Sequence, residues 1–142
     1  MDPGQLASNL RSTVSKLHKG LRKQISSADN YSMTELETIG YLFRSGPLLP
    51  SELAGYTRIT TQSMSQILSK LEGQGVIKRT PSREDKRKVF ISLTHFGKKM
   101  VEKTRYDRDE WLKGLIEASL TAKERELLEK ALPVLSKLTE TR

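Results

Sequence analysis

The chain has 142 residues, of which 35% are hydrophobic, so it can bury the core of one modest domain. It contains no Cys, which excludes disulfides, thiol catalysis and cysteine zinc sites. It has no run of about 18 apolar residues that could span a membrane, and the first residues lack the basic start and apolar stretch of a signal peptide, so we expect a cytoplasmic protein without membrane contact.

Positive charge is concentrated in the middle of the chain. The formal net charge is +8. Basic residues exceed acidic residues by one in residues 1–43, by seven in residues 44–100, and not at all in residues 101–142. This concentration favours a polyanionic partner such as nucleic acid for the middle segment, although basic surfaces also occur on proteins without one.

The first part of the chain predicts two helices. Apolar residues recur at spacings of three and four, the period of one helix face: Leu6, Leu10, Val14, Leu17, Leu21 and Ile25. The polar run 26–32 ends this long helix, and Ser32 with Glu35 forms a capping box that begins the second helix. The second helix stops at residues 45–47, where Gly and Pro follow Ser. Its buried side carries Leu36, Ile39, Leu42 and Phe43.

A second pair of helices follows in the basic segment. Residues 48–49 form a short extended bridge before a third helix over about 51–57. Thr60 is predicted to cap a fourth helix that runs to Gly73, because its side-chain oxygen can accept an otherwise free backbone N–H. Ile59 would anchor the turn between the two helices.

The two sides of the fourth helix differ in chemistry. One side is apolar and can pack on the preceding helices: Met64, Ile67, Leu68 and Leu71. The opposite side carries hydroxyls, amides and one cation but no acidic residue: Thr61, Gln62, Ser65, Gln66, Ser69 and Lys70. Such a face fits a major groove, where Gln can bond adenine bidentately and Ser or Thr can serve several bases. An uncharged polar face alone is weak evidence.

A basic β-hairpin is predicted after the fourth helix. Alternating residues indicate strands over residues 76–80 and 88–93 around a turn at 81–87. The apolar residues of the second strand point one way, so the hairpin can pack on the helices. Its tip carries four cations that can follow phosphates or enter a narrow minor groove: Arg83, Lys86, Arg87 and Lys88. The alternative is a solvated loop, but a charged tip behind a helix pair with a matching polar face favours DNA contact.

The remaining sequence predicts two more helices. Thr94 can cap a helix through residue 120, and Thr121 with Glu124 forms a capping box for a final helix. The final helix has an apolar stripe: Leu127, Leu128, Ala131, Leu132, Leu135 and Leu138. Pro133 predicts a kink or break near Leu132.

The apolar stripes of the first and last helices indicate a partner chain. A two-fold dimer would set two DNA-reading helices about 34 Å apart, and its DNA site would be an inverted repeat. The alternative is a monomer whose terminal helices fold back on one core.

The order and spacing of these elements resemble the winged helix-turn-helix regulators of the MarR family. The matching residues are Leu53-Ala54, Ile59-Thr60, Ser63-Met64-Ser65, Leu71-Glu72, Gly75, Val76-Ile77-Lys78-Arg79, Asp85, Arg87 and Leu93-Thr94. The resemblance covers the whole chain and implies a mainly α fold with a small β-hairpin wing, of the α+β class. It implies one domain over 1–142, divided into a winged helix-turn-helix part at 34–98 (helix-turn-helix 51–73, wing 76–93) and dimerisation helices at 1–28 and 95–142.

The resemblance also implies a function. A member of this family is expected to be a sequence-specific DNA-binding transcriptional regulator, here a repressor, that binds double-stranded DNA as a homodimer and that a small-molecule effector releases. Helix 60–73 would be the recognition helix, while Arg87 would enter the minor groove and Asp85 would hold it in place. The predicted DNA-contacting residues are Ser51, Arg58, Thr60, Thr61, Gln62, Ser63, Ser65, Gln66, Ser69, Lys70, Arg83, Asp85, Lys86, Arg87 and Lys88. An effector pocket between the dimer helices and the winged part would have His18, Arg22 and Tyr41 in its polar lining.

One departure from the family pattern lies in the turn between the third and fourth helices. Thr57-Arg58 stand where relatives often have an apolar residue and Gly. This difference from relatives either alters the geometry of the turn or allows Arg58 to contact a phosphate. The sequence does not decide between these two alternatives.

Other classes of function fit less well. The chain has two His, His18 and His95, and lacks HExxH, P-loop and Gly-rich dinucleotide motifs, so we expect no enzyme, no cofactor and no metal site. A winged helix could also bind RNA or bare phosphate backbone without sequence preference, as an RNA-binding or architectural protein. A protein-interaction module that has lost DNA binding is a further alternative, against which the polar face and the Asp85/Arg87 pair argue.

Overall fold

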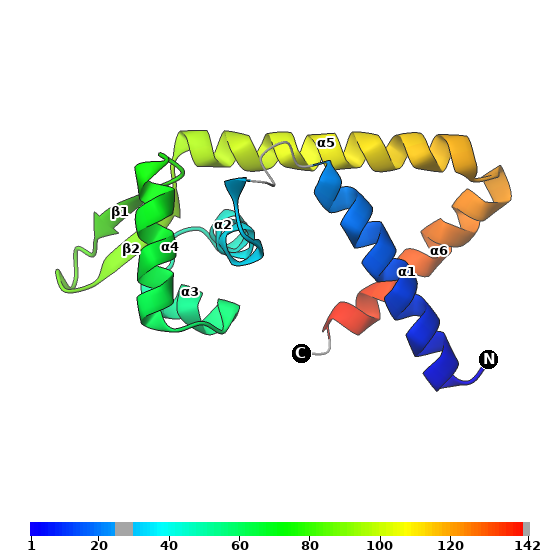
Figure 1. Ribbon diagram of the computed structural model, residues 1–142, viewed down its shortest axis with the longest axis horizontal. Coiled ribbons are helices and arrows are strands. Elements are labelled where there is room, and N and C mark those ends of the chain that lie inside the picture. The colour runs from blue at the N-terminus through cyan, green and yellow to red at the C-terminus, as the bar shows by residue number, and fades with distance from the viewer. Residues whose placement is uncertain (25–29, 141–142) are drawn as a thin grey trace.

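The computed structural model describes residues 1–24 and 30–140, and this part of the chain forms six helices and one two-stranded sheet. In chain order they are α1 (Pro3–Lys23), α2 (Met33–Ser45), α3 (Pro50–Thr57), α4 (Thr61–Gly73), β1 (Ile77–Pro81), β2 (Val89–Leu93), α5 (His95–Ser119) and α6 (Ala122–Glu140). Figure 1 shows α5 as a long rod with α2, α3, α4 and the hairpin at one end and α1 and α6 at the other. The predicted class, mainly α with a small hairpin, is confirmed.

Local side-chain caps explain where the helices begin. The predicted caps are all present: Ser32 with Glu35 at α2, Thr60 at α4, Thr94 at α5, and Thr121 with Glu124 at α6. Asp2 and Gln5 form a further capping box at the start of α1, with Pro3 in the first turn, where a missing N–H costs nothing. Each cap satisfies backbone N–H groups that have no partner inside the helix.

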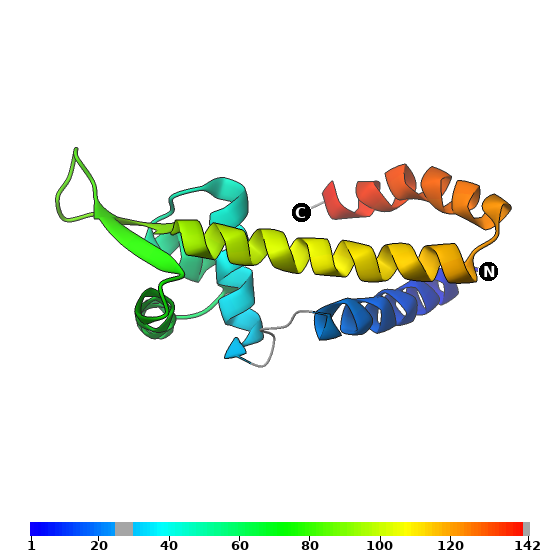
Figure 2. The same ribbon diagram turned by 90° about the horizontal axis from the view of Figure 1, so that it is seen from above.

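The structure corrects the expected boundaries at three places. β1 and β2 begin one residue later than predicted, at Ile77 and Val89. α6 continues through Pro133 as one helix, so of the predicted kink or break near Leu132 the break is wrong; Figure 2 shows that the helix follows a curved course. Ile25 and the first part of the polar run 26–32 lie outside the described residues.

The core lies where α2, α3 and α4 meet the hairpin. Its fully buried apolar side chains are Leu53, Met64, Leu68, Leu71, Val76 and Ile91. The predicted bridge before α3 adds to the sheet, because Leu48 pairs with Ile91 through hydrogen bonds of 2.9 and 2.7 Å in the two directions. Val101 of α5 joins the same core. The core therefore holds α4 and the hairpin in one unit.

The helices at the other end of the molecule bury little. Within the described ranges, neither α1 nor α6 has a buried residue. Helix α1 packs on α5 where Gly20 lies against the ring of Trp111. Large apolar side chains of α1 and α6 stay exposed: Leu6, Val14, Leu17, Leu127, Leu128, Leu132, Val134, Leu135 and Leu138. Among the described residues of this chain, α1 and α6 therefore add no buried side chain to the core of α2, α3, α4 and the hairpin. None of the helices in the described part of the chain is long and apolar enough to cross a membrane.

Candidate nucleic-acid interface

The turn between α3 and α4 has the backbone conformation that usually requires Gly. Arg58 follows α3 with φ 58° and ψ 42°, in the left-handed region. The N–H of Ile59 donates to the carbonyl of Ala54 at 3.1 Å, and the Thr57 hydroxyl donates to the carbonyl of Leu53 at 2.7 Å. These bonds keep the turn tight although an L side chain stands at its left-handed position. The Arg58 side chain itself is exposed, and its contact with phosphate stays a prediction.

Helix α4 presents the predicted polar face to solvent. Its apolar side is buried through Met64, Leu68 and Leu71. The opposite side is exposed at Thr61, Gln62, Ser65, Gln66 and Ser69. At the start of the helix the Thr60 hydroxyl accepts the N–H of Ser63 at 3.0 Å and donates to the Ser63 hydroxyl at 3.0 Å. Both hydroxyls therefore already have partners within the cap. Ser51 is exposed in the first turn of α3.

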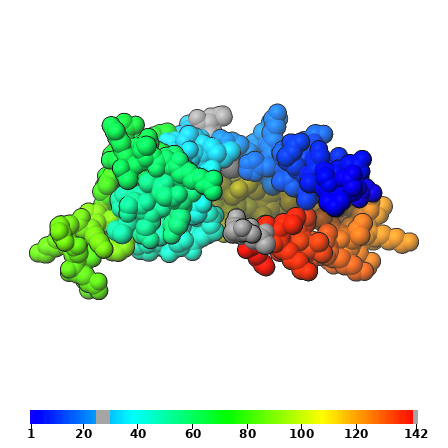
Figure 3. All heavy atoms as spheres, turned by 90° about the horizontal axis from the view of Figure 1, so that it is seen from below, coloured from blue at the N-terminus to red at the C-terminus, as the bar shows by residue number. Residues whose placement is uncertain are grey.

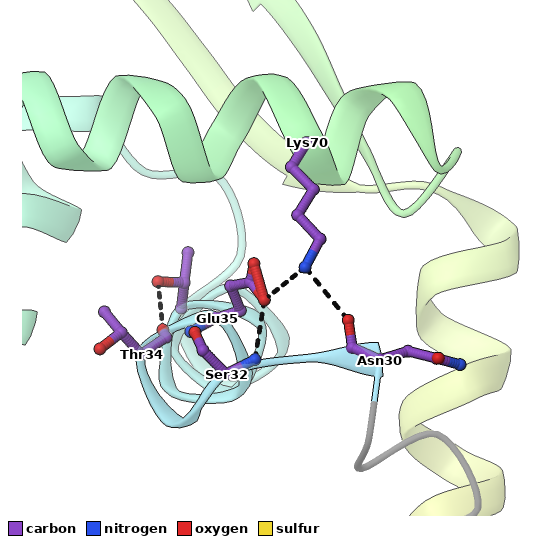
Figure 4. Close-up of polar contacts among 6 residues, drawn as sticks. Asn30, Ser32, Thr34, Glu35 and Lys70 are labelled. Atoms are coloured by element: carbon purple, nitrogen blue, oxygen red, sulfur yellow. Dashed lines mark hydrogen bonds and ion pairs between the residues drawn. The ribbon is translucent and has the colours of Figure 1, made fainter.

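Lys70 behaves differently from the rest of the predicted set. Its Nζ lies 2.8 Å from Oε1 of Glu35 and 3.1 Å from the backbone carbonyl of Asn30. Figure 4 shows the side chain extending from α4 to the beginning of α2. The Lys70 ammonium is therefore engaged in an intramolecular ion pair, which the spacing of residues along α4 did not predict.

Glu35 is a buried carboxylate at this contact. It is 5% exposed. Burial alone would raise the pKa of the Glu35 carboxyl, but hydrogen bonds from Lys70 and the Ser32 backbone N–H, with the Lys70 charge, outweigh it and lower the pKa overall. The carboxylate is thus held in its ionised form. The sequence revealed Glu35 as a capping residue but not as the partner of Lys70.

The wing is an antiparallel hairpin whose tip is braced by an ion pair. Oδ1 of Asp85 accepts the backbone N–H and the Nε–H of Arg87, each at 3.1 Å. Hydrogen bonds from the Arg87 side chain and then from its backbone N–H lower the pKa of the Asp85 carboxyl. The Arg87 side chain is 91% exposed. The other cations of the tip are exposed as well: Arg83, Lys86 and Lys88. The geometry matches the predicted arrangement, in which an acid orients an outward guanidinium.

Helix α4 and the wing lie at the same end of the molecule. Figure 3 shows the wing tip projecting from the end that α4 occupies. The Arg79 side chain of β1 joins the two elements, with its Nε 3.0 Å from Oε1 of Glu72. The sequence analysis missed this pair, since its members lie seven residues apart on elements of different period. The polar face of α4 and the charged tip of the wing therefore lie on two elements that contact each other at one end of the molecule (Figure 3).

The three residues predicted for an effector pocket line a single hollow. It has a volume of about 360 Å³ and lies between α1, α2 and α5. Its lining includes His18, Arg22 and Tyr41, together with Arg44 and Arg108, which the sequence analysis missed. Arg44 lies over the Tyr41 ring, 5.1 Å from its centre, and Tyr41 stacks on Tyr56 of α3 with the ring centres 5.2 Å apart. The wall of this hollow thus continues into the helix pair.

A helix pair with an exposed polar second helix, followed by a charged hairpin on the same core, defines a winged helix-turn-helix protein. Comparison with known proteins agrees with this class. A family model described as the MarR family matches residues 30–88. The chain is 30% identical over 136 residues to the uncharacterised HTH-type transcriptional regulator Mb0904 of Mycobacterium bovis, covering 96% of this chain and 94% of that protein.

Solved structures give the same result over nearly the whole chain. A protein of Pseudomonas aeruginosa PA01 described as a candidate transcriptional regulator is 32% identical, with a TM-score of 0.81 over 97% of this chain and 95% of that one. A mutant of S. aureus MepR bound to an oligodeoxyribonucleotide is 25% identical, with a TM-score of 0.71 over 94% and 97% of the two chains. This chain belongs to the MarR family of winged helix-turn-helix transcriptional regulators.

Proposed function

We propose that this chain binds a specific DNA operator and represses transcription from it. The observation that carries the proposal is the exposed, acid-free polar face of α4 together with the Asp85–Arg87 tip of the wing at the same end of the molecule (Figure 3). On such a surface Gln62 and Gln66 are suited to read bases in the major groove, while the Arg87 guanidinium enters the adjacent minor groove. The similarity to DNA-bound MepR supports this mode of binding.

The proposed regulator is a homodimer, with α1, α5 and α6 forming the interface and α2 to β2 forming the DNA-binding part. Support comes from the apolar side chains that α1 and α6 leave exposed, such as Leu17 and Leu132, 43% and 56% exposed. Exposed apolar surface on this scale is typical of a protein–protein interface. Two-fold symmetry then places two copies of α4 about 34 Å apart, so the operator is an inverted repeat.

Release from DNA by a small molecule is the third part of the proposal. The hollow between α1, α2 and α5 has a volume of about 360 Å³, which is large enough for a small ligand. Its lining combines apolar side chains with the guanidinium groups of Arg22, Arg44 and Arg108. Its wall touches the helix pair through the Tyr41–Tyr56 stack. A ligand that fits only one arrangement of these helices would shift the position of the DNA-binding part.

Selection of bound sequences from random duplexes at fixed, near-physiological salt tests the proposal. An enriched inverted repeat with half-sites about 10 base pairs apart is the expected result. Retention of duplexes without any enriched motif would instead support the alternative, an architectural or RNA-binding protein held by the basic middle segment. Sedimentation of the free protein checks the dimer, for which a monomer at micromolar concentration is the contradicting outcome.

A further inference from the structure

Lys70, on the polar side of α4, has its charged group paired within the protein. Its ammonium donates to the Glu35 carboxylate and to the Asn30 carbonyl, and it lies 5.7 Å from the centre of the Tyr31 ring. All three partners belong to the start of α2 or to the residues just before it (Figure 4). The contact spans 35 residues of sequence, so it joins two elements that the helix-turn-helix loops do not connect directly.

The burial of Glu35 makes it energetically costly to break the ion pair with Lys70. Its Oε1 accepts both the Lys70 ammonium and, at 2.7 Å, the Ser32 N–H of the capping box. If Lys70 turned outward to a phosphate, the carboxylate would stay buried without its counter-charge, which is far more costly than losing an exposed ion pair. The side chain of Lys70 is itself 44% exposed, so the pair lies at the edge of the core.

We propose that Lys70 is a positioning residue, which fixes the recognition helix against α2 through Glu35 and does not itself contact DNA. The inference rests on the proposed function, because DNA is the ligand whose binding the positioning serves. It removes Lys70 from the predicted DNA-contacting residues and adds Glu35 as a residue on which DNA binding depends.

The position of the contact along α4 explains why it matters. Lys70 lies in the last turn of the helix, whereas the base-reading residues begin at Thr61, about 14 Å away along the axis. A tilt of about 10° around the Lys70 end would move the first turn by roughly 2 Å. The side chains of a binding site have to stay within about 0.5 Å of the positions in which they bind. Loss of the contact therefore impairs base reading while leaving the phosphate-binding cations in place.

Two matched carboxylate variants test the proposal by the sign of their effects. Glu35→Gln and Glu72→Gln each remove one negative charge next to α4, and through-space electrostatics alone predicts tighter binding to DNA for both. Glu72 pairs with Arg79 and is 47% exposed, and such surface pairs contribute little to structure. We expect Glu72→Gln to bind the selected operator at least as tightly as the parent and Glu35→Gln to bind it roughly tenfold more weakly. Equal or tighter binding by Glu35→Gln overturns the proposal.

The salt dependence of binding separates positioning from phosphate contact at Lys70. A lysine that neutralises a phosphate contributes about 0.9 to the slope of log K against log salt. We expect Lys70→Met to weaken operator binding without changing this slope, whereas Lys88→Met at the wing tip lowers it. We also expect Lys70→Met to add little to the loss already caused by Glu35→Gln, because both break the same contact. A slope reduced by about 0.9 in Lys70→Met, or full additivity of the two losses, contradicts the positioning role.

Hydrogen exchange in the free protein tests the contact without DNA. We expect faster exchange of the α4 amides in Glu35→Gln and Lys70→Met, and parent-like exchange in Glu72→Gln. Unchanged exchange in the first two variants overturns the inference even if the operator is bound normally by the parent. Failure of the parent to select any DNA sequence refutes the proposed function and leaves this exchange test intact. Should either single variant fail to fold, the double variant Glu35→Gln/Lys70→Met, which leaves no unpaired charge at this site, carries the exchange test.

Discussion

Replacing Arg58 by Gly is expected to stabilise the protein and to weaken its binding to DNA. Arg58 holds a left-handed backbone, with φ 58°. That conformation costs an L residue about 1–2 kcal/mol. Gly relieves this strain but gains about 0.4–1 kcal/mol of freedom in the unfolded chain, so the net stabilisation is about 0.5–1 kcal/mol. In a domain of this size that gain raises Tm by about 2–4 °C.

Arg58→Ala is the matched control for this prediction. It removes the same cation but keeps a Cβ at the left-handed position, so it should not raise Tm. Thermal unfolding at equal protein concentration compares the three proteins. If Arg58 contacts a phosphate, both variants lower the salt slope of DNA binding by about 0.9. A Tm of Arg58→Gly at or below that of Arg58→Ala would refute the argument from strain.

Three further outcomes follow from the site and the packing. Arg87→Ala should weaken binding to all duplexes, while Gln62→Ala relaxes preference at particular bases by about 1–3 kcal/mol, measured by competition with substituted operators; equal losses on random and selected duplexes would remove base reading from Gln62. Because the pKa of Glu35 is lowered below its usual 4.5, its ionised form stabilises the fold above pH 4.5 and this contribution is lost as pH falls through the folded pKa. Acid unfolding of Glu35→Gln should therefore be less steep in that range, and an unchanged profile would contradict the assignment. Gly97→Ala places a Cβ against the Val76 carbonyl and should cost more than about 2 kcal/mol, whereas Gly114→Ala meets open space and should stabilise α5 by about 0.5–1 kcal/mol; urea unfolding checks both signs.

Features of the fold that depend on neighbours in sequence could be predicted. The capping pair Ser32 and Glu35 spans three residues, and its hydrogen bonds form as expected. The polar and apolar sides of α4 follow from the helical period, and burial of Met64 and Leu68 confirms them. Asp85 and Arg87 are two residues apart, so their contact needs only a tight turn.

Features that depend on tertiary contacts could not be predicted. Lys70 falls on the polar side of α4 by period, and only its approach to Glu35 shows where the ammonium goes. Arg108 comes from α5, far in sequence from the other residues of the hollow between α1, α2 and α5, so no spacing rule placed it there. Pro133 lies inside α6 without breaking it. The prediction of a break failed because it considered the hydrogen bond that Pro removes and not the continuity of the helix on either side.

Helix α5 connects the two ends of the molecule (Figure 1). Its 25 residues make a continuous rod about 37 Å long, which is packed on α1 near Trp111 and embedded in the core at Val101. A pivot of about 8° at the Trp111 contact carries the start of α5, about 24 Å away, through roughly 3 Å. That displacement is close to the rise of one base-pair step, about 3.4 Å. A small rearrangement around the rod is thus geometrically sufficient to move a recognition helix out of register with its operator.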